Sequence, residues 1–219
     1  MLKMNSNIDH TLLKPTATAE DIKQLCEEAM DNKFYAVCIN GSFVKLAKSF
    51  LKNSEVKVCT VIGFPLGAMA TEAKTFEAQQ AIEDGADEVD MVINIGWAKS
   101  GNFNDIKEEI ASVKRRIGDK ILKVILEICY LTSEEIRLAT QAAIDAKADF
   151  VKTSTGFGTD GATLEAVAIM MEIAKDKIQI KASGGIRDFL TAKSYLDLVV
   201  TRIGTTSGIS ILEGENSVL

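Results

Sequence analysis

The sequence predicts a single (β/α)8 barrel with parallel strands, the TIM-barrel fold. Short β-branched runs alternate with longer amphipathic segments along the 219 residues, and such alternation joins parallel strands through helical crossovers. Eight runs in about 200 residues fit a closed barrel better than an open doubly wound sheet. No glycine-rich dinucleotide fingerprint follows the first run, which weakens the Rossmann alternative.

The eight predicted strands are short runs rich in Val and Ile, as expected of strands that are covered on both faces. In chain order they cover residues 9–13, 36–40, 58–63, 88–93, 122–128, 150–155, 179–183 and 201–204.

The predicted helices between these strands have apolar residues at helical spacing, for example Ile22, Leu25, Cys26 and Ala29. Thr132 or Ser133 is suited to cap the fourth of them. The five predicted helices cover residues 18–32, 71–84, 103–116, 133–146 and 163–175.

Composition indicates one domain over residues 1–219, because 47% of residues are hydrophobic and no linker-like stretch interrupts the chain. A net charge of −6 without a basic stripe argues against nucleic acid as a partner. No apolar run reaches the roughly 18 residues of a membrane span, and the start of the chain lacks a signal-peptide core. Small molecules are the expected partners, and a homodimer stays open.

The four cysteines are scattered and form no C-x-x-C motif, and there is one histidine. Reduced thiols in a cytoplasmic protein fit this pattern best, and we expect neither a metal nor another cofactor.

Charged residues occur in the middle of several predicted strands, where apolar residues are normal. In the fourth strand the bulky alternate residues suit the helix layer, so Asp90 is expected to point into the barrel. The same alternation puts Lys152 and Lys181 inside neighbouring strands, and adds Lys123 and Glu127 from the fifth strand.

Two inward lysines on neighbouring strands are unusual, because burying a charged amine is costly. Two ammonium groups close together also repel each other, which disfavours protonation of both. Lys152 and Lys181 therefore favour one neutral amine near pH 7, which a Schiff-base nucleophile requires. The structural alternative is a buried ion network in which the lysines pair with Asp90 or Glu127.

Glycine and hydroxyl residues gather in two loops, 183–187 (SGGIR) and 204–208 (GTTSG), after the last two strands. In barrels these loops often hold phosphate through backbone N–H groups. Thr155 and Gly156, after the sixth strand, are candidates to form a third wall of this phosphate site.

Other candidates are weaker. His10 is expected to be structural, and Cys38 to be a small core residue that shares its inward face with Asn40, a candidate to line the site. Phe157 is expected to pack on the rim.

Seven segments in register resemble the deoxyribose-phosphate aldolase family along nearly the whole chain. They are IDHTLLKP, TVIGFPLG, DEVDMVINIG, LKVILE, DFVKTSTGFG, IKASGGIR and RIGTTSG. The resemblance implies reversible, metal-free cleavage of 2-deoxy-D-ribose 5-phosphate to D-glyceraldehyde 3-phosphate and acetaldehyde.

The resemblance also implies residue roles. It makes Lys152 the Schiff-base lysine, Lys181 its partner in proton transfer, and Asp90 a proton relay. From their strand positions, Lys123, Asn40 and Cys38 are further candidates for this network. The residues that it assigns to the phosphate are Gly156, Gly184, Gly185, Arg187, Gly204, Thr206 and Ser207. The chain departs from the family at Phe157, where some members have lysine, and over residues 194–200.

Three other functions stay open. They are a different Schiff-base barrel such as a transaldolase-like or keto-acid aldolase, a phosphosugar isomerase, and a barrel that only binds phosphate as a sensor or scaffold. The lysine pair with Asp90 favours the deoxyribose enzyme over all three.

Overall fold

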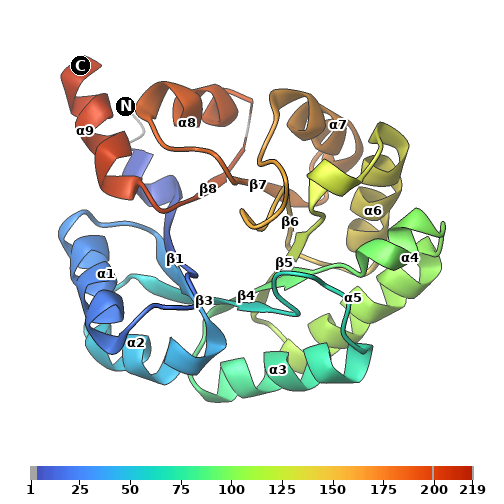
Figure 1. The fold of residues 1–219 in the computed structure, drawn as a ribbon, viewed down its shortest axis with the longest axis horizontal. Coiled ribbons are helices and arrows are strands. Elements are labelled where there is room, and N and C mark those ends of the chain that lie inside the picture. Colours follow the sequence, from blue (N-terminus) through green and yellow to red (C-terminus); the bar gives the residue numbers. More distant parts are fainter. Residues whose placement is uncertain (1–3, 199, 219) are drawn as a thin grey trace.

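A computed structural model describes residues 4–198 and 200–218. Within them the strands β1 to β8 pair in chain order, all parallel, and β8 pairs with β1 to close a barrel, as the sequence predicts. Helices surround the strands, as the view down the barrel shows (Figure 1). The strands β1 to β8 are Ile8–Leu12, Ala36–Ile39, Lys57–Ile62, Glu88–Val92, Ile121–Ile125, Phe150–Lys152, Gln179–Ser183 and Arg202–Thr205.

All five predicted helices are present as α1, α3, α5, α6 and α7, and the described residues form four further α-helices around the barrel. No helix in the described part of the chain has the length and apolar character needed to cross a bilayer. The helices α1 to α9 are Ala19–Asp31, Val44–Phe50, Thr71–Glu83, Ile95–Lys99, Phe103–Ile117, Ser133–Asp145, Leu164–Ala174, Phe189–Leu196 and Gly208–Val218. The short 3-10 helices are Met4–Asn7, Gly41–Phe43 and Ile128–Tyr130.

Helix starts follow the predicted cap chemistry. Thr132 caps α6, its side chain accepting from the backbone N–H of Glu135 while the Glu135 carboxylate accepts from the backbone N–H of Thr132. Thr18 and Asp21 form the same reciprocal box at α1. Such boxes satisfy N–H groups that the first helical turn leaves without partners.

Side-chain alternation along the strands separates two layers, as predicted. Val89, Met91 and Ile93 belong to the large apolar core between strands and helices. A much smaller apolar cluster fills one side of the barrel interior and includes Cys38 and Cys59. The interior therefore leaves room for charged side chains, whereas barrels are usually filled by layers of branched apolar residues.

Two strands end three residues earlier than the sequence predicts. β5 ends at Ile125 and β6 at Lys152. Glu127 lies beyond the end of β5 with a left-handed backbone (φ 55°), so the strand alternation no longer fixes its direction. Residues 194–200, the departure from the family pattern, include Val199, which lies outside the described residues; α8 ends before it at Leu196.

Closure of the barrel places the first strand, β1, beside the last strand, β8. Asp9 of β1 pairs in register with Gly204 of β8, and Ser183 of β7 pairs with Gly204 on its other side. The residues that follow β1 consequently lie beside the loops that follow β7 and β8.

Candidate active site

A buried network of ion pairs crosses the barrel interior. Its members come from six strands, and each side chain is almost fully buried. They are the carboxylates Asp9, Glu88 and Asp90 and the basic side chains Lys123, Lys152, Lys181 and Arg202.

Asp90 of β4 is the centre of this network. Its Oδ2 accepts from Lys152 Nζ at 2.8 Å and from Lys181 Nζ at 2.9 Å, and its Oδ1 accepts from Lys123 Nζ at 2.7 Å. Burial alone would raise the pKa of Asp90, but the three ammonium groups outweigh burial and hold its pKa well below the ordinary range. The Asp90 carboxylate is therefore ionised and links the two lysines that the sequence singles out.

Lys181 of β7 has a second carboxylate partner. Its Nζ lies 2.5 Å from Oδ2 of Asp9, and the other oxygen of Asp9 accepts from Arg202 at 2.8 Å. Burial opposes the charged amine, but Asp9 and Asp90 together raise the pKa of Lys181 above its ordinary value. Lys181 is thus held as an ammonium group.

Lys123 and Arg202 form the base of the network. Lys123 Nζ lies 2.5 Å from Glu88 Oε2, which also accepts from Arg202 at 3.2 Å. The Arg202 guanidinium stacks 3.4 Å from the ring centroid of Tyr35. Despite burial, Asp90 and its neighbours raise the pKa of Lys123 well above the ordinary value, so Lys123 also stays charged.

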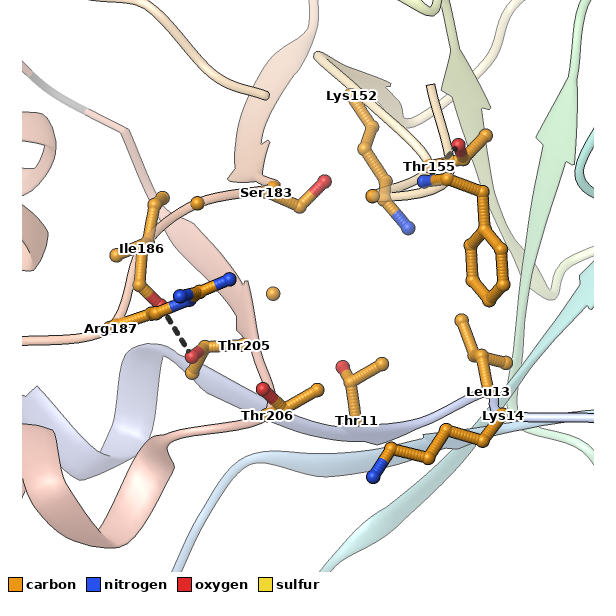
Figure 2. Close-up of a pocket in the computed structure, with 15 residues that line it drawn as sticks. Thr11, Leu13, Lys14, Lys152, Thr155, Ser183, Ile186, Arg187, Thr205 and Thr206 are labelled. Carbon is orange, nitrogen blue, oxygen red and sulfur yellow. Dashed lines mark hydrogen bonds between the residues drawn. The ribbon is translucent and has the colours of Figure 1, made fainter. Parts of the chain in front are cut away.

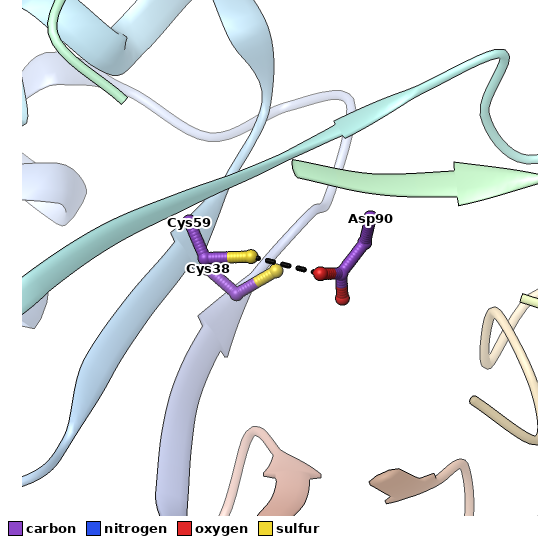
Figure 3. Close-up of side chains that lie close together, drawn as sticks. All are labelled: Cys38, Cys59 and Asp90. Atoms are coloured by element: carbon purple, nitrogen blue, oxygen red, sulfur yellow. Dashed lines mark hydrogen bonds between the residues drawn. The ribbon is translucent and has the colours of Figure 1, made fainter. Parts of the chain in front are cut away.

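Cys38 and Cys59 lie against Asp90 (Figure 3). They face each other in register on β2 and β3, and Cys59 Sγ lies 3.1 Å from Asp90 Oδ1. The three side chains could geometrically approach a metal ion together. However, Lys123 Nζ lies 3.3 Å from Cys59 Sγ and already pairs with Asp90. An ammonium group there competes with a metal cation for the same ligand atoms, so the cluster suits a packed core better than a metal centre.

A cavity opens at the carboxyl ends of the strands, and the Lys152 amine reaches into it (Figure 2). This is the face where barrel enzymes place their active sites. The lining comes from the ends of β1, β6, β7 and β8. It comprises Thr11, Leu13, Lys14, Lys152, Thr155, Gly156, Phe157, Ser183, Gly184, Gly185, Ile186, Arg187, Gly204, Thr205 and Thr206.

The charges that line this cavity have one sign. Lys14, Lys152 and Arg187 are basic, and none of the described lining residues is Asp or Glu. The chain as a whole has a net charge of −6. A local concentration of positive charge in an acidic protein indicates an anionic ligand.

Two glycines allow close packing in and beneath the cavity wall. A Cβ at Gly204 would lie 3.0 Å from Cε of Lys181, so glycine there leaves space for that side chain. Gly184 has φ 88° and touches Gly161 of the loop after β6, and a Cβ at Gly184 would come within 2.9 Å of Gly161 Cα. These glycines let the loops after β6, β7 and β8 pack together as one wall.

The structure brings together most of the residues predicted from the sequence. Six of the seven predicted phosphate residues line the cavity, and Ser207 does not; its N–H donates to Thr205 Oγ1 at 2.9 Å. Asn40 precedes a short 3-10 helix and is not in the lining. Phe157 lies on the rim with its ring centroid 5.3 Å from that of Phe64 in an edge-to-face arrangement, which confirms its predicted packing role.

Three weaker assignments also have an outcome. His10 faces outward, and its Nε2 lies 2.7 Å from a carboxylate oxygen of Glu28 on α1, which agrees with a structural role. Cys38 is buried in the interior core, as expected. Of the two carboxylates considered as partners of the lysines, Asp90 forms these ion pairs, whereas the Glu127 carboxylate accepts from the backbone N–H and the hydroxyl of Thr155.

Several residues of the site were missed. Asp9, Glu88 and Arg202 belong to the ion network, and Thr11 and Lys14 line the cavity. Strand alternation could have found the first three, because each lies two residues or a multiple of two from another inward residue on its strand. Lys14 follows β1, where no alternation applies.

Fold and site together define a class: α/β barrels with a buried lysine at the carboxyl end of β6, above a carboxylate shared with a second lysine. Among known families, that described as DeoC/LacD family aldolase matches residues 3–212. The chain belongs to this family, and it is therefore an aldolase, a carbon–carbon lyase.

Individual relatives are similar to this protein over nearly the whole chain. A deoxyribose-phosphate aldolase of Coprothermobacter proteolyticus is 52% identical over 212 residues, which cover 97% of each chain. A solved structure titled as the aldolase QR15 superposes with a TM-score of 0.94 at 44% identity, covering 99% of this chain and 97% of that one. The deoxyribose phosphate aldolase of Aeropyrum pernix, described as tetrameric, superposes with a TM-score of 0.90 at 34% identity over 99% and 92% of the two chains.

Proposed function

We propose that this chain reversibly cleaves 2-deoxy-D-ribose 5-phosphate to D-glyceraldehyde 3-phosphate and acetaldehyde through a Schiff base on Lys152. The observation that carries the proposal is the position of the Lys152 amine. It reaches into a cavity lined by basic groups while it rests on a carboxylate shared with Lys181. A nucleophilic amine, a proton-transfer pair and an anion-binding wall thus face one space.

Charge balance favours a neutral Lys152. The ion network has three carboxylates and four basic side chains, so one proton fewer on a lysine makes it electrically neutral. An uncompensated buried charge is costly. Lys123, Lys181 and Arg202 each have at least two carboxylate partners, whereas Lys152 has only Asp90 among the described residues. Lys152 therefore has the fewest carboxylate partners of the four basic side chains, and we propose it as the amine that acts as the nucleophile.

The proposed chemistry begins when neutral Lys152 attacks C1 of the open-chain sugar to form a carbinolamine, which takes up a proton from the shuttle described below and loses water to give an iminium ion. A base removes the C3 hydroxyl proton, the C2–C3 bond breaks, and its electron pair moves toward the iminium to form an enamine. Glyceraldehyde 3-phosphate leaves as the aldehyde. Protonation of the enamine carbon and hydrolysis then release acetaldehyde and regenerate Lys152.

Asp90 and Lys181 are the proposed proton shuttle. Asp90 touches both amines, so a proton that leaves Lys152 or the substrate can pass within hydrogen-bond distance to this pair. Lys123 holds the other oxygen of Asp90 at 2.7 Å and so positions the carboxylate. We propose Lys123 as a positioning residue, not as a group that touches the substrate.

Acetaldehyde release tests the proposed reaction directly. Incubation with deoxyribose 5-phosphate is expected to yield acetaldehyde and glyceraldehyde 3-phosphate in equal amounts, as followed by two coupled dehydrogenase assays. Cleavage of a ketose phosphate without acetaldehyde release would instead indicate a different Schiff-base aldolase. Isomerisation without a borohydride-trapped adduct would indicate an isomerase.

The phosphate end of the substrate is proposed to lie between the loops after β7 and β8. Replacing Arg187 by methionine is expected to raise the KM for deoxyribose 5-phosphate about 10- to 100-fold, because a charged hydrogen bond to phosphate is lost. Turnover of non-phosphorylated deoxyribose should change little, since the lysines and Asp90 are untouched. Steady-state kinetics on both substrates measure the difference.

Arg116→Met is the matched control, because Arg116 is exposed in the last turn of α5, away from the cavity lining. It should behave like the wild type on both substrates. Equal losses on both substrates in the Arg187 variant would place Arg187 outside the phosphate site.

A further inference from the structure

We propose that Lys14 is a second cationic ligand of the substrate phosphate and, with Arg187, sets the preference for phosphorylated over non-phosphorylated substrates. This inference rests on the proposed function and adds a residue that neither sequence alternation nor the glycine loops indicate. Lys14 follows β1 directly and lines the same cavity as Lys152 and Arg187.

The fold places Lys14 beside the phosphate loops. β1 pairs with β8, so the chain that leaves β1 runs next to the loop after β8. Thr11 and Thr206 lie side by side at the cavity wall, with Lys14 below them and Arg187 on a different side (Figure 2). A ligand held by the loops after β7 and β8 would consequently have one basic side chain on each of two sides.

Lys14 is available for a ligand. It is exposed, and its side-chain amine forms neither a hydrogen bond nor an ion pair with any residue that the structure describes; its backbone carbonyl accepts from the N–H of Ala17 at 3.1 Å. The pKa of Asp21 is lowered mainly by hydrogen bonds from Thr18, and the charge of Lys14 adds only a small further lowering. Lysine has a flexible stem and a compact charge, so its amine can move to an anion at the cavity mouth.

Lys14 supplies a positive charge that a bound phosphate group requires. A phosphate monoester has a charge of about −1.5 to −2 near pH 7. If Lys152 is neutral, as the proposed chemistry requires, Arg187 and Lys14 are the remaining basic groups among the described lining residues. Together they supply two positive charges, whereas Arg187 alone would leave the bound phosphate partly uncompensated.

Lys14→Met tests this role, because methionine keeps the length of the stem and removes the charge. The KM for deoxyribose 5-phosphate should rise about tenfold, and the inhibition constant of inorganic phosphate should rise by a similar factor. The value of kcat/KM for non-phosphorylated deoxyribose should stay within about twofold of wild type, and Lys14→Arg should restore most of the phosphate preference.

Lys52→Met is the control, since Lys52 is exposed just after α2 and is not in the cavity lining. It should match the wild type in every assay. Unchanged phosphate inhibition and KM in Lys14→Met, or an equal loss on both sugars, would overturn the role of Lys14. Such a result would leave the proposed function intact as long as wild-type protein still releases acetaldehyde, whereas failure of the wild type would count against the function itself.

Discussion

Replacing Lys152 with arginine is expected to lower deoxyribose 5-phosphate cleavage at least about 10⁴-fold, the scale at which loss of a nucleophile acts. A guanidinium stays protonated near neutral pH and cannot form an imine. The substitution keeps a hydrogen-bond donor beside Asp90, so the contact with this carboxylate can be retained while the nucleophile is removed. Acetaldehyde release by the purified variant, compared with wild type, measures the effect.

Lys14→Arg is a useful companion, because it makes the same exchange at another lysine of the same cavity. We expect that variant to remain active. Thermal unfolding of both variants separates loss of chemistry from loss of fold. Substantial activity in a folded Lys152→Arg variant would show that the covalent intermediate forms on another residue or not at all.

Asp90→Asn is expected to lower kcat by about 10² to 10⁴, the range in which a general acid or base contributes. Asparagine cannot accept a proton, and its amide would direct N–H groups toward cationic neighbours. The variant should also lose about 3–5 kcal/mol in the free energy of unfolding, because removing one partner leaves buried charges unpaired. Lys123, Lys152 and Lys181 would all lose their shared carboxylate.

Asp197→Asn is the corresponding surface control. Asp197 pairs with Lys193 one turn earlier at the exposed end of α8, and exposed pairs of this kind contribute little. Denaturant unfolding and kcat should both stay near wild type in this control. A stable and fully active Asp90→Asn variant would exclude Asp90 from the proton shuttle and from the stability of the network.

The sequence was sufficient for the barrel and for the centre of the site. Strand alternation depends only on local backbone geometry. It therefore predicted that Asp90, Lys152 and Lys181 point into the barrel, and all three lie on observed strands, where Asp90 contacts both lysines. The same rule applied to β1 and β8 would have added Asp9 and Arg202. Charged residues in the middle of strands were thus the strongest indication of function in the chain.

The rest depends on where strands end and which loops meet. Glu127 was misplaced because β5 ends at Ile125, and only the folded loop shows that its carboxylate is bonded to Thr155. Lys14 escaped notice because it is distant in sequence from Arg187, and closure of β8 against β1 brings their loops together. Backbone hydrogen bonds across the barrel, not local pattern, decide both positions.

Four of the described α-helices were not predicted from the sequence, and local features explain why. α2 and α4 have only 7 and 5 residues, too few for a helical period to stand out. α9 begins at Gly208, the last residue of the glycine-rich loop 204–208, and α8 lies between the loop 183–187 and the predicted strand 201–204. None of these helices changes the face of the barrel on which the site lies.

The most direct test of the Schiff-base mechanism is mass spectrometry after borohydride reduction in the presence of deoxyribose 5-phosphate. Reduction of the trapped imine should add the mass of the bound aldehyde-derived fragment, and peptide mapping should place it on Lys152. The adduct should be absent without substrate and absent in Lys152→Arg. An adduct on Lys181, Lys123 or Lys14, or a fully active wild-type protein that yields no adduct, would contradict the mechanism.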